Sequence, residues 1–219
     1  MGKEFAVSLF ARRFAMLFLA SLFVVGPFGF AASVAQRPET SIAMLQKAIN
    51  ARDLALAEQY LDIDGVITKI IDILLTEEDV AKSLNNGALT IGLALAISSD
   101  ANTAAAFKEF LQSEAREYVR HGVVSGAFSG ALVKNASTYG GLIKKTFRGK
   151  EKDKIAFGPA SVLSRKVESA MVTTTLTRGD NGRAYPLKLR LERQSGVWRV
   201  VELINTRDII QKAIKKDAK

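Results

Sequence analysis

Apolar positions divide the chain into two parts with different periods. Over residues 38–145 the apolar residues recur every three or four positions, and over residues 157–204 they tend to alternate with polar ones. The longer period is typical of helices that bury one face, and the alternation is typical of strands with one wet face. We therefore expect an α+β fold, with a helical layer packed on a C-terminal antiparallel meander of about three to four strands.

Cap residues and apolar faces define the predicted helices. Pro38 marks the start of the first helix, and Asp53 is expected to cap a short second one. A third apolar face follows over residues 66–74, a capping box at 76–79 precedes a further helix, and residues 88–97 predict a buried helix. Asp100 is expected to cap the next helix. The first helical face carries Ile42, Leu45 and Ile49.

Three glycines recur at intervals of four within the last of these predicted helices. Gly122, Gly126 and Gly130 would lie on one stripe of a helix. Each glycine costs a helix about 1 kcal/mol relative to alanine, so a compensating contact is expected. The spacing therefore predicts close approach of another helix along this stripe.

The C-terminal part contains the strand signals. Apolar residues alternate with charged ones from Tyr185 to Glu192, and further strands are predicted over residues 166–177 and 197–204. Turn signals at 180–182 and 195–196 predict hairpins, because Asn and Gly tolerate a positive φ. A short terminal helix is expected over residues 206–216, with Ile209, Ile210 and Ile214 directed inward.

The N-terminus has the pattern of a secretory signal. Lys3, Arg12 and Arg13 precede an uncharged run over residues 14–25, and helix breakers and small residues follow it. This order predicts a signal peptide over residues 1–35, cleaved between Ala35 and Gln36, and a periplasmic protein. The alternative is that residues 14–35 are retained as an inner-membrane anchor, because their 22 uncharged positions are enough to span a bilayer with the domain outside.

Composition restricts the chemistry of the remaining domain, residues 36–219. The chain has no cysteine, so disulfides, thiol catalysis and thiolate metal sites are excluded. Loss of the leader changes the net charge from +9 to +7, because three cations and one acid leave with it. A basic exported domain favours anionic partners such as lipid headgroups, and no nucleic-acid partner is expected.

Six cations are concentrated between the helical and strand-rich parts. Residues 144–156 predict an exposed basic connection that could contact a membrane surface, although such a charge run is also typical of a solvated loop. The cations are Lys144, Lys145, Arg148, Lys150, Lys152 and Lys154.

Few side chains have the pattern of a catalytic site. There is one histidine, His121, and the chain has neither a nucleophile-elbow motif nor a phosphate-binding glycine loop. Asp62, Asp64 and Tyr60 are the remaining candidates for acid–base chemistry, which a carboxylate near an apolar pocket can perform. The same stretch also has the pattern of a turn and helix cap. No cofactor and no metal are expected.

Several stretches resemble a known architecture. They are residues 44–53, residues 60–64, and the late strands at 187–192 and 196–201 with the only tryptophan, Trp198. Helices followed by a curved antiparallel sheet resemble the nuclear-transport-factor-like superfamily of cone-shaped, cystatin-like α+β domains. The stretches are also similar to a bacterial exported protein family of unknown function within or near it. The resemblance implies a fold and an exported location.

Two functions are expected from these observations. The first is a non-catalytic cell-envelope protein that binds a lipid, another hydrophobic ligand or a partner protein, since aliphatic helix faces are abundant and reactive residues are few. The alternative is a small acid–base enzyme of the same cone-shaped superfamily, with Asp62, Asp64 or Tyr60 directed into the cone.

Overall fold

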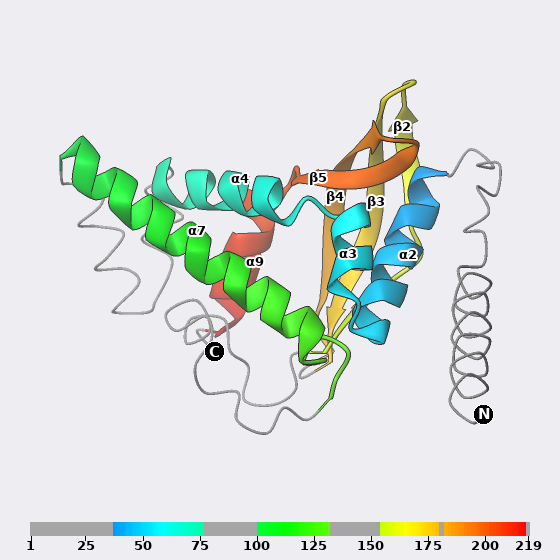
Figure 1. Ribbon diagram of the computed structural model, residues 1–219, viewed down its shortest axis with the longest axis horizontal. Coiled ribbons are helices and arrows are strands. Elements are labelled where there is room, and N and C mark those ends of the chain that lie inside the picture. The colour runs from blue at the N-terminus through cyan, green and yellow to red at the C-terminus, as the bar shows by residue number, and fades with distance from the viewer. Residues whose placement is uncertain (1–36, 77–99, 132–153, 180–181, 218–219) are drawn as a thin grey trace, which may run out of the picture. The chain divides into compact units, whose positions relative to one another are not determined.

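In the residues that the structure describes, the chain has an α+β fold in which four helices precede an antiparallel sheet and one helix follows it (Figure 1). The computed structural model describes residues 37–76, 100–131, 154–179 and 182–217, with side chains of the last helix described to Lys212. The leader, the cleavage site at Ala35–Gln36, the capping box after Thr76 and the helix expected over 88–97 lie outside this part. The predicted fold class is therefore confirmed for the described residues. Its elements are α2 (Pro38–Ala51), α3 (Leu54–Tyr60), α4 (Ile63–Thr76), α7 (Ala101–Val124), β1 (Ile155–Phe157), β2 (Ser161–Arg165), β3 (Ser169–Arg178), β4 (Ala184–Gln194), β5 (Val197–Leu203) and α9 (Thr206–Asp217).

The helix starts follow the predicted caps. Pro38 is the first residue of α2. Its missing N–H costs no hydrogen bond there, because the first N–H groups of a helix have no intrahelical acceptor. The Asp53 Oδ1 atom accepts a hydrogen bond from the Leu56 N–H at 2.9 Å and so caps α3. The Asp100 carboxylate accepts from the N–H groups of Asn102 and Thr103 at the start of α7. The hydrogen bonds from Thr103 also lower the pKa of Asp100.

Helix α7 ends earlier than the glycine spacing predicted. It stops at Val124, and both Gly126 and Gly130 have positive φ values, +79° and +89°, which a helix excludes. The predicted glycine stripe along one helix is therefore wrong. Gly122 does lie in α7, but the group that approaches it is the Phe128 ring, which a methyl group at position 122 would overlap. Gly126 and Gly130 turn the chain after α7 and do not form a stripe along a helix.

The sheet is antiparallel, with strand order β1-β3-β4-β5, and β2 also pairs with β3. The β4–β5 hairpin turns at Ser195 and Gly196, whose φ values of +50° and +83° confirm the predicted turn. Register shifts in β2 and between Arg190 and Leu191 mark bulges, which bend strands and increase their twist. The sheet accordingly curls around its apolar face (Figure 1).

The strand-rich part begins within the segment predicted as an exposed connection. Strand β1 pairs Ile155 with Arg178 and Phe157 with Leu176, while β2 pairs with the first half of β3. The predicted connection over residues 144–156 is therefore wrong at its last two residues, which belong to β1. Three residues are too few for a periodic signal, so this edge strand depends on tertiary hydrogen bonds. One is donated by the Phe157 N–H to the Oε1 atom of Gln46 on α2 at 2.7 Å.

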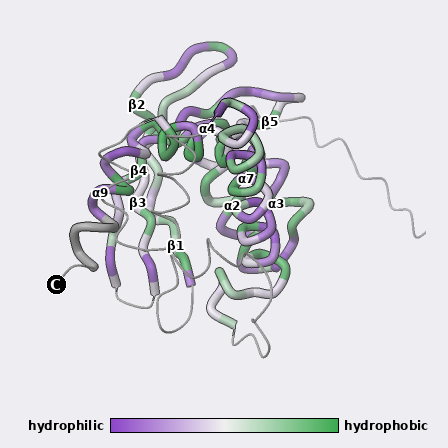
Figure 2. Tube along the Cα trace, turned by 90° about the vertical axis from the view of Figure 1, so that its left-hand side faces the viewer, coloured by the Kyte–Doolittle hydropathy of each residue, from purple (hydrophilic) through white to green (hydrophobic). Residues whose placement is uncertain are grey.

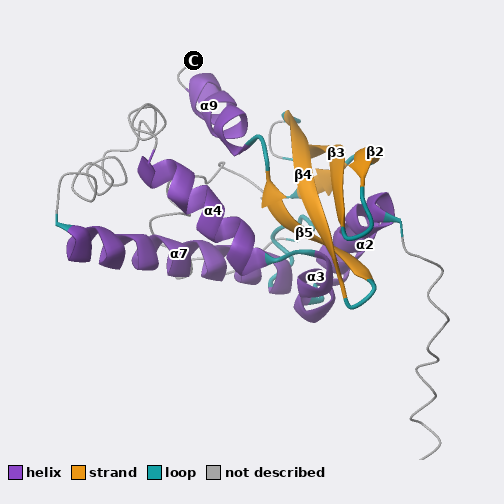
Figure 3. Ribbon diagram, turned by 90° about the horizontal axis from the view of Figure 1, so that it is seen from above, coloured by secondary structure: helices purple, strands orange, loops and turns teal. Residues whose placement is uncertain are grey.

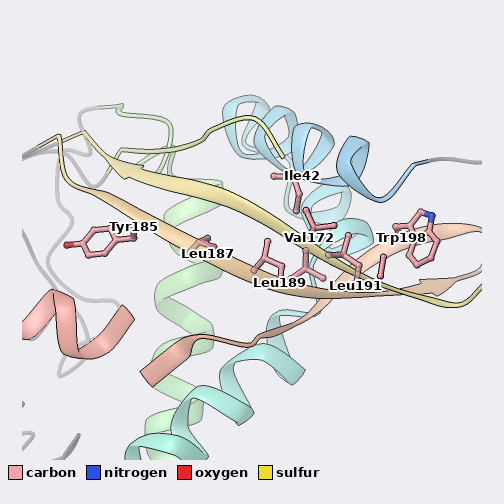
Figure 4. Close-up of a cluster of buried hydrophobic side chains, with 9 residues drawn as sticks. Ile42, Val172, Tyr185, Leu187, Leu189, Leu191 and Trp198 are labelled. Carbon is pink, nitrogen blue, oxygen red and sulfur yellow. The ribbon is translucent and has the colours of Figure 1, made fainter. Parts of the chain in front are cut away.

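The largest apolar cluster lies between α2 and the concave side of the sheet. Every second residue of β4 from Tyr185 to Leu191 is buried, which confirms the alternation in the sequence. Figure 4 shows Ile42 of α2 directed toward Val172, with Trp198 near one end of the cluster. The Trp198 side chain is fully buried. Figure 2 shows hydrophobic and hydrophilic positions interspersed along both strands and helices.

A second apolar cluster joins α4, α7 and α9. Figure 3 shows α4 and α7 lying alongside each other, and Ile71 of α4 and Leu111 of α7 are both buried in this cluster. The terminal helix contributes the buried Ile210, so its predicted inward face is confirmed at that position. In the part of the chain that the structure describes, no helix combines the length and apolar character needed to cross a membrane.

Candidate functional site

An incompletely filled apolar region lies where α2, α3 and α7 meet the β1 end of the sheet. It contains a half-open pocket of about 310 Å³, within the range of small-molecule sites although at its lower end. Eleven of the thirteen lining residues are aliphatic or phenylalanine, and the others are Tyr118 and Arg178. The lining consists of Leu45, Ile49, Ala57, Leu61, Ile63, Tyr118, Val119, Val123, Phe128, Ile155, Phe157, Leu176 and Arg178.

The turn after α7 shapes one wall of this pocket. The Phe128 N–H donates to the carbonyl oxygen of Gly122 at 3.1 Å, and the ring packs over that glycine. The Phe128 and Tyr118 rings meet edge-to-face with 5.6 Å between their centroids. The Phe128 carbonyl accepts the Ile155 N–H at 2.9 Å. The turn is therefore fixed to both α7 and β1, and the pocket is bounded by regular elements.

The lining suits an apolar ligand. None of the described residues that line the pocket is acidic, and Arg178 is the only charged one. An apolar group that enters such a pocket leaves water without leaving a buried polar group unsatisfied. The arrangement can therefore bind an apolar group and offers one cation beside it.

A second hollow of about 400 Å³ lies between α2 and the segment that joins β1 to β2. Its residues include Glu39 and the exposed Ala43 and Pro159, and the Gln46 side chain there is already bonded to β1. This hollow is a mixed, open surface. The pocket beside Phe128 is the better candidate site.

Asp62 serves as the N-cap of α4. Its Oδ1 atom accepts a hydrogen bond from the Gly65 N–H at 3.1 Å, and its backbone carbonyl accepts from the Val66 N–H. Gly65 provides the space, because a methyl group there would overlap the carboxylate. The Arg199 guanidinium lies 3.8 Å from Oδ1. This stretch therefore has the turn and helix cap that its pattern predicted. Asp62 does not line the pocket.

Asp64 and Tyr60 are also away from the pocket lining. The Asp64 side chain is 56% exposed and pairs with Arg116 at 3.0 Å and with Arg120 at 3.4 Å. Arg120 also pairs with Glu58, so these ions join α3, α4 and α7 at the surface. Tyr60 is buried in the apolar cluster around the pocket. None of these three candidates lines the pocket.

The predicted basic connection is described only at its end. Lys154 is exposed, and its aliphatic chain lies against Gly130 and Gly179. Lys144, Lys145, Arg148, Lys150 and Lys152 lie outside the described residues. Among the residues that are described, no three histidine or acidic side chains gather where they could hold a metal ion.

None of the residues that line the pocket is among the site residues predicted from the sequence. The sequence predicts a helix at Phe128, because the glycines around it match a helical spacing. The alternative signal was the density of Gly and Ser over residues 125–130, which is typical of turns. Arg178 carries no sequence signal, because nothing in its neighbours indicates that the strand ends at a pocket.

No protein-family model, no curated protein and no solved structure matches this chain. The resemblance to the nuclear-transport-factor-like superfamily stays a prediction.

Proposed function

We propose that this is an exported, non-catalytic cell-envelope protein that binds a hydrophobic ligand, such as a lipid chain, in the pocket beside Phe128. The pocket carries the proposal. Its 310 Å³ are bordered mainly by apolar side chains from α2, α3, α4, α7 and the sheet. Such a volume left empty would cost the protein contacts that a ligand can restore. The leader-like N-terminus supports export, with the domain periplasmic or held at the inner membrane by residues 14–35.

The acid–base enzyme remains the alternative expectation, with no specific observation in its favour. It needs a carboxylate or phenol directed at a bound substrate, and the described lining of the pocket contains no carboxylate. Asp62 caps α4, and Asp64 is engaged by two arginines.

Native mass spectrometry of the protein purified from the envelope fraction tests the binding proposal. We expect a hydrophobic molecule bound in a one-to-one ratio. Val119→Trp should remove it, because the larger side chain fills the pocket from α7. Val124→Trp is the matched control, since Val124 lies on the same helix, is 54% exposed and does not line the pocket. A wild-type protein that carries no ligand and takes up no apolar probe would overturn the proposal.

The predicted export is tested separately, by N-terminal sequencing of protein from the periplasmic and membrane fractions. A mature chain that begins at Gln36 would support cleavage, and an intact chain in the inner membrane would support the anchor. An intact chain found only in the cytosol would contradict export in either form.

A further inference from the structure

The β2–β3 and β4–β5 turns lie at the same end of the sheet. Ser169, the first residue of β3, pairs with a residue near the end of β4, so the turn before β3 and the turn after β4 are neighbours. A hydrogen bond from the Arg193 N–H to the Glu168 carbonyl, 2.9 Å long, joins them directly. Figures 1 and 2 both show the start of α2 toward this end. We call residues 162–168 and 193–197 the hairpin end.

Exposed apolar side chains are concentrated at the hairpin end. Among the described residues, six large apolar side chains are exposed, and three of them, Val162, Leu163 and Val167, lie within one short stretch. Val167 lies in the β2–β3 turn and is 77% exposed, the largest value of the six. Apolar side chains scattered singly over a surface are ordinary, whereas a group of them is typical of a surface that meets a partner or a membrane. The hairpin end is such a group.

Basic side chains flank this apolar group. Arg165 and Lys166 are exposed and immediately precede the tip of the β2–β3 turn, and Arg193 lies at the β4–β5 turn. The Cζ atom of Arg165 lies 5.5 Å from the centre of the Trp198 ring, a cation–π contact that holds the guanidinium beside the sheet. With these three cations against the acid Glu168, the hairpin end has a net charge of +2. It therefore combines exposed apolar side chains with positive charge.

The chain also enters the domain toward this end. Pro38 is the first residue of α2, and residues 36 and 37 separate it from the predicted leader. The three peptide units from residue 35 to Pro38 span at most about 10 Å. Retention of residues 14–35 as an anchor would therefore hold the start of α2 at the bilayer surface, and the hairpin end lies toward the same side of the domain (Figure 1).

We infer that the hairpin end is a docking surface for an anionic lipid bilayer. Val167 and Leu163 enter the headgroup region, and the three cations lie among the anionic headgroups. Apolar side chains gain free energy when they leave water, and basic residues near an anionic surface add an attraction that salt screens. The inference rests on the export in the proposed function and is independent of the pocket. Docking would place the domain beside the membrane, where a hydrophobic ligand is available.

Site-directed fluorescence tests this inference, because a chain without cysteine allows a dye at one chosen position. Val167→Cys carries an environment-sensitive dye at the hairpin end, and Ala184→Cys, also exposed, carries it at the other end of β4. The protein from the envelope fraction is added to vesicles of phosphatidylglycerol and phosphatidylcholine in equal parts, or is reconstituted into them if it is anchored. We expect the dye at position 167 to shift to shorter wavelength and to be quenched by a lipid-attached quencher, with little change at position 184. Vesicles of phosphatidylcholine alone should give a smaller shift.

A charge variant in the Val167→Cys background tests the cations. Lys166→Gln should lower the affinity for the anionic vesicles about fivefold at physiological salt. For an anchored chain, it should lower the salt concentration at which the dye shift is lost. The matched control is Lys154→Gln, which removes an exposed cation at the β1 end of the sheet, roughly 30 Å away along the strands, and should have little effect. Urea denaturation of each variant verifies that it folds.

The possible failures are distinct. No shift at position 167, an equal shift at position 184, or equal losses in Lys166→Gln and Lys154→Gln would each overturn the docking surface. A shift that grows with protein concentration in the absence of vesicles would overturn it too, and would assign the surface to a second copy of the chain, because β2 lies at an edge of the described sheet. None of these results bears on the pocket, which Val119→Trp tests. An intact chain found only in the cytosol would overturn export and the docking surface together.

Discussion

The two apolar clusters that contact helix α2 differ in how completely they are filled. On the sheet side, Trp198, Leu191 and Val172 are fully buried, and the cluster closes around them. On the side of α3 and α7, the cluster around Phe128 leaves a pocket of about 310 Å³. Both are built from the same kinds of residue, so hydrophobicity does not distinguish them. Residues of the first cluster, Ile42 and Ala160 among them, border only the mixed, open hollow between α2 and the β1–β2 segment, whereas the lining of the second is almost entirely apolar.

The two clusters also differ in the charged residues that lie near them. On the outer side of the sheet, Glu202 accepts hydrogen bonds from Lys69 at 3.1 Å and Arg190 at 2.7 Å, and Arg190 also pairs with Glu192. Cations there are matched by acids. The described lining of the pocket contains one cation, Arg178, and no acid. The comparison indicates that the filled cluster contributes more to stability than the cluster that contains the pocket.

The largest effect is expected from emptying the closed cluster. Trp198→Ala should lower the free energy of unfolding by about 3–5 kcal/mol, because it removes a fully buried ring from a packed core. Phe110→Ala is the control, since that ring is 48% exposed and should cost about 0.5 kcal/mol or less. Urea denaturation followed by circular dichroism measures both. Similar losses would mean that the cluster is less tightly packed than described.

Substituting a larger side chain into each cluster should reveal directly which of them has unfilled space. Ala170 belongs to the closed cluster and Ala57 lines the pocket, and both are buried. Ala170→Leu should destabilise the protein by about 1–3 kcal/mol, because a packed core cannot accept the added carbons without strain. Ala57→Leu should change stability by about 0.5 kcal/mol or less, because its carbons can enter the pocket. Equal destabilisation in urea melts would contradict the described pocket.

The cap of α4 should have a smaller effect. Asp62→Ala should cost about 1 kcal/mol, and Asp62→Asn should retain most of the stability, because asparagine caps helices as well as aspartate does. Thermal unfolding of the three proteins measures the difference. If the two variants were equally destabilised, the carboxylate charge and not the cap would be the dominant contribution, through Arg199.

The smallest effect concerns the ion network on the sheet. Partial burial by itself would raise the pKa of Glu202. The hydrogen bond and charge of Lys69, together with those of Arg190, lower the pKa by a larger amount, so that it falls below its ordinary 4.5. Because the folded-state pKa is the lower one, the stabilisation is complete above pH 4.5 and is lost as the pH falls through the folded-state value.

Glu202→Gln isolates this contribution. The variant should be less stable than the wild type by about 1 kcal/mol or less at neutral pH, since the partners are partly exposed. The difference should shrink in acid. Stability measured in urea from pH 7 down to pH 3 tests the expected sign, and a difference that grows in acid would contradict it.

Part of the fold followed from local pattern. The alternation from Tyr185 to Leu191, the caps at Asp53 and Asp100 and the turn at Ser195–Gly196 are each encoded within a few residues, and the structure has them as predicted. Strand β1 was missed because it is held by the Gln46 side chain and the Phe128 carbonyl, which are distant in sequence. The glycine spacing misled because an interval of four residues fits both a helical stripe and a turn.

The sequence by itself determined the order of helices and strands, the buried face of each confirmed element, the absence of thiol chemistry and the excess of basic residues. Periodicity and composition suffice for these properties because each depends on neighbours along the chain. Only the tertiary structure decided that Asp62 is a cap and that Phe128 and Arg178 line an unfilled apolar pocket. A pocket is the space left when distant segments pack imperfectly, and a pattern read along one segment does not contain that information.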